Sequence, residues 1–371
     1  FGEMIMAAKE KYPEPTYLEY GFGELEHDVI KKELCCYCGN CIAFCPKIDK
    51  EGNRPELVDY DPLCGLCYAY CPRTMLDMPG MAKKIFGRER KEDEPLGIYR
   101  KAASAKIAKS NVKAQDGGVV TALLIRALES GVIDCAVVTG RDEKWRSVPK
   151  VATTAEEIAA AAGTKYTITP SVTGVQMAMD QGFKKIGFVG TPCQIQALRK
   201  VQLLEEPYQF GQKKIALLVG LFCMENFEYE RLFPNLVQGS FGLKPEDVDK
   251  FEIQKGMFRV LSGDKVKEVP IDETDDYVWK GCGPCFDFSA ELADVSVGSV
   301  GSKAGWSTVL PRTDVGAKVY EEALKAGAVE EAAVSEKGLA LAGRLAKGKE
   351  ERFTTKTAEL LGRGVPVNIR R

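Results

Sequence analysis

Apolar segments bounded by glycine alternate with helical segments along most of the chain after residue 99. Short apolar runs of this kind predict buried strands, and apolar positions that recur every three or four residues predict helices. Strands alternating with helices favour an α/β fold whose sheet is largely covered. The turn at Ser262–Lys265 is expected to close a hairpin. The strands are expected at 132–138, 185–189, 214–222, 257–261 and 266–270, and the helices at 116–127, 155–162 and 172–180.

Changes in composition divide the chain into five parts. A charged lead-in precedes a cysteine-dense segment, a linker of mixed charge follows, then the α/β part, and the last part is helical and charged. A basic helix after 337 is able to dock a partner, although a solvated helix is the simpler interpretation. The five parts are 1–30, 31–80, 81–98, 99–330 and 331–371.

The chain has 371 residues, 45% of them apolar, and a formal net charge of −2. This size is enough for two domains with a buried core, and the charge gives no basic field that would attract nucleic acid. No apolar run is long enough to predict a membrane-spanning segment. No signal peptide is recognisable in the sequence, so we expect a cytoplasmic protein, at most peripheral to a membrane complex.

Eight of the 13 cysteines lie between residues 35 and 71. Disulfide frameworks suit small secreted domains, so metal ligation explains this density better. Cys135 lies in an apolar run and is interpreted as a buried structural thiol. The only histidine, His27, is expected on the surface. No Ser–His–Asp or Cys–His system is recognisable, which disfavours hydrolysis.

The first cysteine run has the C-x2-C-x2-C-x3-C-P spacing that binds 4Fe–4S clusters in bacterial ferredoxins. Three thiolates of such a run hold one cluster, and the fourth, before the proline, reaches the other. Zinc is the alternative, but structural zinc usually takes two ligand pairs that are farther apart. The spacing therefore favours a cluster. The residues are Cys35, Cys38, Cys41 and Cys45-Pro46.

The second run is incomplete, because Asp61 stands where its first cysteine is expected. The fourth ligand of the second cluster stays open: Asp61 through an oxygen, Cys36, or none, with a three-iron cluster. Two clusters so linked pass single electrons. By analogy, one cluster takes Cys35, Cys38, Cys41 and Cys71, and the other takes Cys45, Cys64 and Cys67.

Four cysteines remain in the α/β part. Two follow predicted strands, and two form a C-x2-C pair in a Gly/Pro turn, so either a third metal site or unrelated buried thiols fit the pattern. These cysteines are Cys193, Cys223, Cys282 and Cys285.

Three polar loops are candidates for cofactor binding. Asp116-Gly117-Gly118 opens a helix, where backbone amides favour a phosphate, although a plain turn is the common alternative. Gly163–Thr167 offers a cation, hydroxyls and an aromatic ring, and 297–302 is rich in Gly and Ser. No G-x-G-x-x-G motif supports a Rossmann site. Without a nucleophile system, chemistry must come from bound cofactors, and a flavin converts two-electron into one-electron transfer.

These residues resemble the beta subunits of coenzyme F420-reducing hydrogenase and dehydrogenase. The resemblance covers about 99–330, and the preceding cysteine module is similar to that of members serving formate dehydrogenase, F420H2 dehydrogenase or F420-dependent sulfite reductase. The blocks that carry it are 113–121, 162–167, Thr191-Pro192-Cys193-Gln194, 223–227 and 291–302.

The resemblance implies a mixed-sheet α/β flavin domain after a bacterial-ferredoxin-like module with two 4Fe–4S clusters. It further implies FAD, coenzyme F420 as substrate, and a third 4Fe–4S cluster held by Cys193, Cys223, Cys282 and Cys285. No side chain is expected to act as a catalyst. The FAD contacts that it implies are Asp116, Gly117, Gly118, Thr121, Gly163, Thr164, Lys165, Tyr166, Asn226, Ser299 and Gly301.

The expected function is hydride exchange between F420 and FAD, with single electrons relayed through the clusters to or from a partner protein of a redox complex. F420 is anionic, so nearby cations such as Lys165 are expected to matter. One alternative is a related flavin reductase fed by ferredoxin, as in phototrophs that reduce chlorophyll-type pigments. The other is an electron-relay protein without a flavin.

Overall fold

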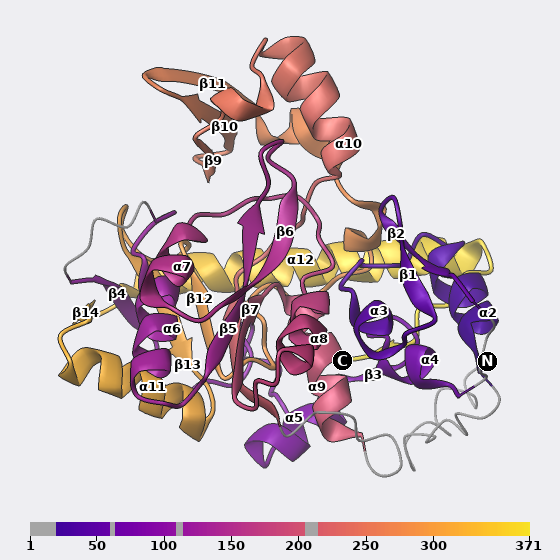
Figure 1. Cartoon of the computed structure of the whole chain (residues 1–371), viewed down its shortest axis with the longest axis horizontal. Coiled ribbons are helices and arrows are strands. Elements are labelled where there is room, and N and C mark those ends of the chain that lie inside the picture. Colours follow the sequence, from indigo (N-terminus) through magenta and orange to yellow (C-terminus); the bar gives the residue numbers. More distant parts are fainter. Residues whose placement is uncertain (1–19, 60–63, 109–113, 205–213) are drawn as a thin grey trace.

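The computed structural model describes residues 20–59, 64–108, 114–204 and 214–371 (Figure 1). Its largest element is an eight-stranded sheet with the order β14-β4-β13-β12-β8-β7-β5-β6. Strands β12, β8, β7 and β5 are mutually parallel, and the other pairs are antiparallel. The strands are β4 Ala103–Ile107, β5 Cys135–Arg141, β6 Ser147–Ala152, β7 Ile186–Gly190, β8 Ile215–Leu221, β12 Val295–Gly298, β13 Ser307–Pro311 and β14 Val329–Ala332.

The predicted α/β fold with a mixed sheet is confirmed, and the predicted strands and helices are found within a few residues. β5 begins at Cys135 rather than at 132, because Ile133 belongs to the connection from α6. Gly118 caps α6 with φ +69°, so the helix starts after the glycine pair. The helices around the sheet are α6 Val119–Glu129, α7 Ala155–Ala160, α8 Thr173–Asp180, α9 Pro192–Leu203 and α11 Asp314–Lys325.

Both faces of the sheet are covered, which explains why its strands are continuously apolar. Along β5, Cys135 and Val137 face one hydrophobic cluster, which includes residues of α8 and α9. Ala136 and Val138 face the other, which includes residues of α6 and α11. Cys135 is fully buried, as expected of a structural thiol.

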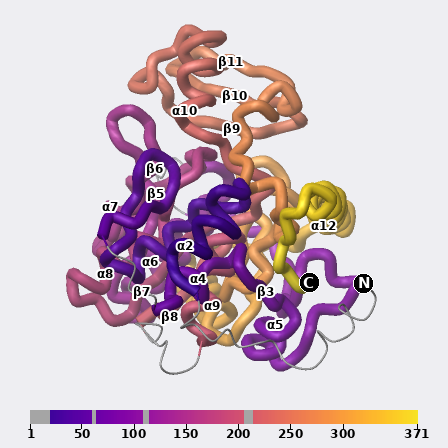
Figure 2. Tube along the Cα trace, turned by 90° about the vertical axis from the view of Figure 1, so that its right-hand side faces the viewer, coloured from indigo at the N-terminus to yellow at the C-terminus, as the bar shows by residue number. Residues whose placement is uncertain are grey.

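A smaller three-stranded sheet stands apart from the main sheet at the top of Figures 1 and 2. Its core is aromatic and contains Trp145, Phe233, Phe251 and Phe258. The predicted hairpin is present, with Ser262 opposite Lys265. The elements are β9 Lys250–Gln254, β10 Met257–Ser262 and β11 Lys265–Pro270, with α10 Tyr229–Arg231 and the helical turns η5 Leu232–Ser240, η6 Pro245–Asp247, η7 Ile271–Tyr277 and η8 Lys280–Cys282.

The cysteine-rich segment forms a compact unit against α8 and α9. Its two cysteine runs have the same local structure, because Gly39 and Gly65, each in a left-handed conformation, begin the short helices α3 and α4. Asn40 fixes the unit to the α/β part by donating to Tyr70 O and Ala197 O. The elements are α2 Phe22–Leu25, η3 Glu26–Ile30, α3 Asn40–Phe44, β1 Ile48–Glu51, β2 Arg54–Leu57, α4 Leu66–Tyr70, β3 Leu76–Asp77 and α5 Met78–Phe86. His27 lies on η3 with an exposed side chain.

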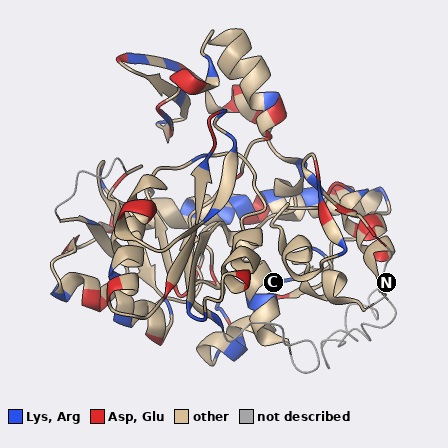
Figure 3. Cartoon of the chain, in the orientation of Figure 1, with Lys and Arg blue, Asp and Glu red and all other residues tan. Residues whose placement is uncertain are grey.

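The C-terminal helix α12, Glu336–Gly362, extends 27 residues across the molecule towards the cysteine-rich unit (Figure 1). The expectation of a solvated helix is wrong for one of its faces, which buries Ala346, Lys349 and Phe353. After it, β15 Ile369–Arg370 pairs with β3. Basic and acidic residues alternate along α12 (Figure 3). Among the described residues, no helix has the length and apolarity needed to cross a bilayer.

Candidate cofactor and cluster site

Two cysteines and one Gly/Ser loop follow neighbouring parallel strands. Cys193 follows β7, Cys223 follows β8, and the loop with Ser299 and Gly301 follows β12. Because these strands are adjacent and parallel, their carboxyl ends meet at one edge of the sheet. That edge is the usual ligand-binding edge of an α/β sheet.

The second cysteine pair reaches this edge through Asn226. Trp279 N donates to Asn226 O over 2.8 Å, and the Cys282 thiol donates to the same oxygen over 4.0 Å. Asn226 Nδ2 in turn donates to Cys223 Sγ over 3.5 Å. Burial raises the pKa of Cys282 to about 12, with Cys285 and Cys193 contributing. The four cysteines of the α/β part therefore lie in one electrostatic cluster.

The N-terminal cysteines form a second cluster. Burial and then Cys71 raise the pKa of Cys35 to about 12. The pKa of Cys41 is also raised, by burial and then by Cys35, Cys71 and Cys67. The structure thus brings Cys71 to the first run, as the ferredoxin analogy predicts. Cys45 and Cys67 pack with Cys41 in one hydrophobic cluster, Cys64 is partly exposed, and Asp61 lies outside the described residues.

Cys36 points away from the second run. Its thiol interacts with Cys193 and Cys38, and it packs in the core beside α9. This position argues against Cys36 as a ligand with Cys45, Cys64 and Cys67. Cys36 instead connects the N-terminal cysteines with those of the α/β part.

Within the described ranges, no group of three or more His, Cys, Asp or Glu side chains is spaced to hold a single metal ion. A tetrahedral zinc with bonds of about 2.3 Å would require closely spaced sulfurs. In a 4Fe–4S cluster each thiolate binds a different iron, so the sulfurs stand farther apart. The spacing therefore argues against a preformed zinc site and leaves a cluster as the better fit.

Buried cations without carboxylate partners accompany the cysteines. Arg73 is 3% exposed, and its guanidinium nitrogens make no hydrogen bond of normal geometry. Lys200 donates to Cys71 O and Met75 O, each over 2.6 Å. Lys349, 1% exposed, donates to Cys223 O over 2.6 Å and Asp287 O over 2.9 Å. Buried charges are costly unless compensated, so these cations suit an anionic group among the sulfurs.

These cations act on Cys285 in particular. Burial alone would raise the pKa of this thiol, but Lys349 and Arg73 lower it below its ordinary value. The pKa of Arg73 itself is raised, because Cys36, Cys285 and Cys193 outweigh the effect of burial. Cys285 is therefore the thiol whose surroundings most favour a thiolate ligand.

The predicted phosphate cradle is tightly built. A Cβ at Gly117 would lie 2.5 Å from Ala105 O, so no larger residue fits without a shift. Gly117 N donates to Ser307 Oγ over 3.2 Å, which joins the cradle to the loop after β12. Thr121 is buried on α6. Burial raises the pKa of Asp116. Gly117 thus meets the close-approach requirement of a phosphate loop.

The loop 163–167 lies against this cradle, since Thr164 N donates to Gln115 Oε1 over 3.2 Å. Lys165 points its ammonium at the carbonyls of Ala161, Ala162 and Gly163 at the end of α7. Burial, with Arg141 and Lys150, lowers its pKa to about 8. Lys165 therefore shapes the loop, while Arg141 and Lys150 add positive charge that sequence reasoning missed.

Tyr166 connects the loop to the cysteines. Its backbone is strained, with φ +59°, and its carbonyl accepts from Phe227 N over 2.8 Å. Burial raises the pKa of the Tyr166 hydroxyl, and Asp116 and Cys223 both contribute. One side chain thus faces the cradle and the cysteine cluster together.

The loop after β12 is the least enclosed part. Ser299 is exposed, whereas Gly301 has φ +104° and a Cβ there would meet Thr308 Oγ1 at 2.7 Å. Ser302 and Thr308 share a hydrogen bond of 2.9 Å. Gly301 is therefore required by the loop conformation itself.

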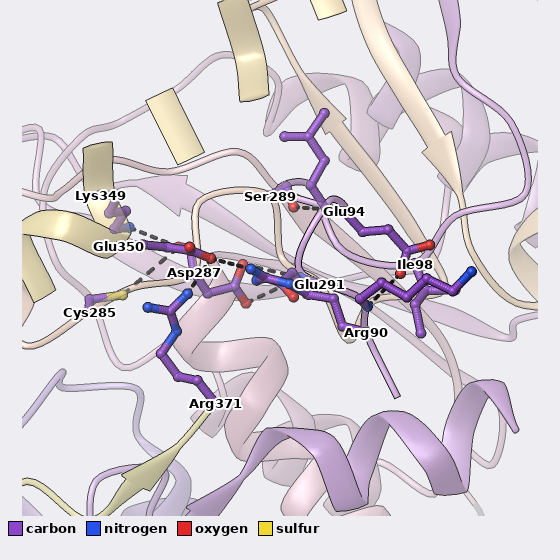
Figure 4. A network of polar contacts seen from close by, with 12 residues as sticks. Arg90, Glu94, Ile98, Cys285, Asp287, Ser289, Glu291, Lys349, Glu350 and Arg371 are labelled. Atoms are coloured by element: carbon purple, nitrogen blue, oxygen red, sulfur yellow. Dashed lines mark hydrogen bonds and ion pairs between the residues drawn. The ribbon is translucent and has the colours of Figure 1, made fainter. Parts of the chain in front are cut away.

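Behind the cysteines, a polar network supports the loop that carries Cys285 (Figure 4). Glu291 N donates to the Asp287 carboxylate, and Arg90 bridges Glu291 and Glu350 at 2.8 and 2.7 Å. Arg371 also pairs with Glu350. The network joins the predicted linker, the cysteine loop and the C-terminal segment.

The α/β fold, with its cysteines and glycine loops at one sheet edge, matches two family models of the coenzyme F420 hydrogenase/dehydrogenase beta subunit. The model of its N-terminal part matches residues 101–175, and the model of its C-terminal part matches 183–337. The chain therefore belongs to the coenzyme F420 hydrogenase/dehydrogenase beta-subunit family, which confirms the resemblance found in its sequence.

Particular relatives extend this result. The beta subunit of coenzyme F420 hydrogenase of Methanothermobacter thermautotrophicus is 43% identical over 73% of this chain and 98% of its own length. The protein named FpoF-type, or F, among the subunits of F(420)H(2) dehydrogenase of Methanosarcina mazei is 32% identical over 88% of this chain and 93% of its own. A chain of the F420-reducing [NiFe] hydrogenase complex from Methanosarcina barkeri superposes with a TM-score of 0.70, at 39% identity over 76% of this chain and 98% of that one.

Sequence reasoning missed Arg73, Lys200 and Lys349. The position of Arg73, two residues after Cys71, offered a signal, because a cation next to a cluster ligand is easily noticed. Lys349 gave no such signal, since 126 residues separate it from Cys223.

Proposed function

We propose that this chain is the electron-transfer component of a redox complex, which exchanges a hydride between coenzyme F420 and FAD and relays single electrons through 4Fe–4S clusters to or from partner proteins. Support for F420 comes from the relatives, whose names specify it. When bound, the flavin would supply the conversion between two-electron and one-electron transfer.

One observation carries the proposal: Tyr166 contacts the surroundings of both Asp116 and Cys223. A flavin held by the 116–118 cradle and the 163–167 loop would lie next to the cysteine cluster. Cys36, beside Cys193, then connects that cluster with the N-terminal one. The order of sites is the order in which electrons would pass.

The protein's own part is to bind and orient. Gly117 and Gly118 would admit the flavin phosphates, and Arg141 and Lys150 would favour an anionic ligand. We assign FAD contacts to Asp116, Gly117, Gly118, Thr121, Gly163, Thr164, Lys165, Tyr166, Asn226, Ser299 and Gly301. Lys165 contributes by holding its loop, and no side chain is proposed as a catalyst.

We assign three clusters. The cluster nearest the flavin takes Cys193, Cys223, Cys282 and Cys285, and the next takes Cys35, Cys38, Cys41 and Cys71. The third takes Cys45, Cys64 and Cys67, with Asp61 proposed as its fourth ligand rather than Cys36. The long match to the F(420)H(2) dehydrogenase relative supports an N-terminal cluster module, since a match over 88% of the chain extends into residues 31–80.

Anaerobic purification followed by iron, sulfide and flavin analysis and an F420 assay tests the proposal. We expect bound FAD, about four irons per complete cluster, and F420-dependent reduction of a one-electron acceptor. Iron without FAD would favour a plain relay protein, and FAD without F420 turnover would favour a ferredoxin-driven flavin reductase. Protein free of iron would overturn the proposal.

A further inference from the structure

The C-terminal helix α12 reaches the cysteine cluster of the α/β part with a single buried charge. Lys349 lies on the buried face of this helix, beyond the residues matched by the family models, which end at 337. At 1% exposure, its ammonium is removed from water. None of its hydrogen bonds goes to a carboxylate: both accepting atoms are backbone oxygens.

Those two oxygens belong to the two loops that carry the cysteines. Cys223 O lies on the loop after β8, and Asp287 O lies two residues after Cys285. The Cys285 thiol also donates to Asp287 O over 3.9 Å. Lys349 therefore joins the two loops and places a positive charge beside both ligand-bearing segments.

Two neutral carbonyls do not balance a full positive charge buried in protein, and such burial is costly without an anion. The Asp287 carboxylate is occupied by Glu291 N and Gln196 Nε2 instead. Arg73, the second buried cation acting on Cys285, also lacks a hydrogen-bonded partner of normal geometry among the described residues. Both charges would be balanced by a cluster with its thiolates, which is anionic.

We propose that Lys349 is a positioning residue for the cluster at Cys193, Cys223, Cys282 and Cys285: its fixed charge raises the reduction potential of that cluster, and its hydrogen bonds hold the two cysteine loops together. This inference rests on the proposed function, since it requires a cluster at these cysteines. The direction follows from electrostatics, because reduction adds one negative charge and a nearby buried cation stabilises the reduced form.

Potentiometric titration of the anaerobically purified full chain, followed by electron paramagnetic resonance, tests the inference. Lys349→Gln keeps a donor for the carbonyls but removes the charge, whereas Lys349→Arg keeps the charge. Lys347→Met is the matched control, because it removes a positive charge from an exposed position on the same helix. Iron content and circular dichroism verify each preparation.

We expect Lys349→Gln to lower the equilibrium constant for one-electron reduction of this cluster about tenfold, a shift of about 59 mV towards more negative potential. Lys349→Arg should restore most of the shift, and Lys347→Met should leave the potential unchanged because exposed charge is screened. If Lys349→Gln does not fold, Arg73→Gln replaces it, with the same shift expected.

A folded, iron-replete Lys349→Gln with the wild-type potential would overturn the inference while leaving the proposed function intact. Equal shifts in Lys349→Gln and Lys347→Met would overturn it as well, because they would show a general charge effect. Loss of this cluster alone in Lys349→Gln, with the other clusters retained, would support the clamping role. Wild-type protein without iron would instead remove the proposed function.

Discussion

Lys349 donates a hydrogen bond of 2.6 Å to the carbonyl oxygen of Cys223, across a sequence separation of 126 residues. The contact places the C-terminal helix directly against a cysteine loop that lies at the carboxyl end of β8. Because the same ammonium also binds Asp287 O, the helix holds two loops in register. The C-terminal segment is therefore part of the site.

Substitution of one cysteine in the α/β part should remove one cluster. We expect Cys223→Ser to lose about four irons per chain and to retain FAD and the N-terminal clusters. F420-dependent reduction of a one-electron acceptor should fall sharply, because the flavin loses its neighbouring cluster. Iron analysis and the acceptor assay measure this.

Cys135→Ala is the control for that substitution, since Cys135 is buried on β5 and outside both cysteine clusters. It should keep its full iron content and cost at most a few kcal/mol of stability, from about 1 upwards. Equal iron loss in both variants would contradict the assignment.

The cradle at Gly117 predicts a loss of flavin binding. In Gly117→Ala the added Cβ would meet Ala105 O at 2.5 Å, so the loop must shift. We expect FAD to bind at least about tenfold more weakly, equivalent to about 1.4 kcal/mol. Fluorescence of released flavin and titration with FAD provide the measurement.

Gly131→Asn, at the other end of α6, is the matched control for the cradle. Nothing lies within 4 Å of a Cβ there, and asparagine tolerates the left-handed backbone. Its FAD content should match that of the wild type. Unchanged FAD affinity in Gly117→Ala would exclude the cradle as a flavin site.

Glu291 should make thermal stability depend on pH. Burial and Asp287 raise its pKa to about 7, against the attraction of Arg90 and Arg312. The folded protein then binds this proton more tightly than the unfolded chain does. The stabilising contribution is complete below the ordinary value of 4.5 and is lost as the pH rises through about 7.

We therefore expect the Tm of the wild type to fall relative to that of Glu291→Gln as the pH increases from about 5 to about 8. Differential scanning calorimetry at several pH values under anaerobic conditions makes the comparison. Parallel Tm profiles for the two proteins would refute the assignment.

Arg312 should be the most important single cation for stability. It is 2% exposed and donates to Leu96 O, Ile98 O, and the backbone and hydroxyl oxygens of Ser289, as well as to Ser296 Oγ. Arg312→Leu leaves these acceptors unpaired, so we expect a loss of about 3–5 kcal/mol. Chemical denaturation measures the difference.

Arg100→Met serves for comparison with Arg312. Arg100 is half exposed, and its partner Asp314 is almost fully exposed. The free energy of unfolding should change by less than about 1 kcal/mol. A similar cost for both arginines would mean that the Arg312 network contributes little.

Much of the architecture was predictable because it depends on local patterns. The run around Cys135 is apolar at nearly every position, and its side chains indeed alternate between two buried faces. Glycines at 117 and 118 predicted a tight helix start. Element ends were less certain: β5 begins later than its apolar run, because Ile133 is used to fill the connection.

The sequence by itself determined the spacing of the cysteine runs, the α/β alternation and the glycine loops, since each depends on residues within one turn or strand. Only the tertiary structure decided that Cys36 turns towards Cys193, that Tyr166 lies between Asp116 and Cys223, and that Lys349 supplies charge from the C-terminal helix. The physical reason is that burial and electrostatics depend on distance in space, and packing of the sheet and helices sets that distance independently of separation along the chain.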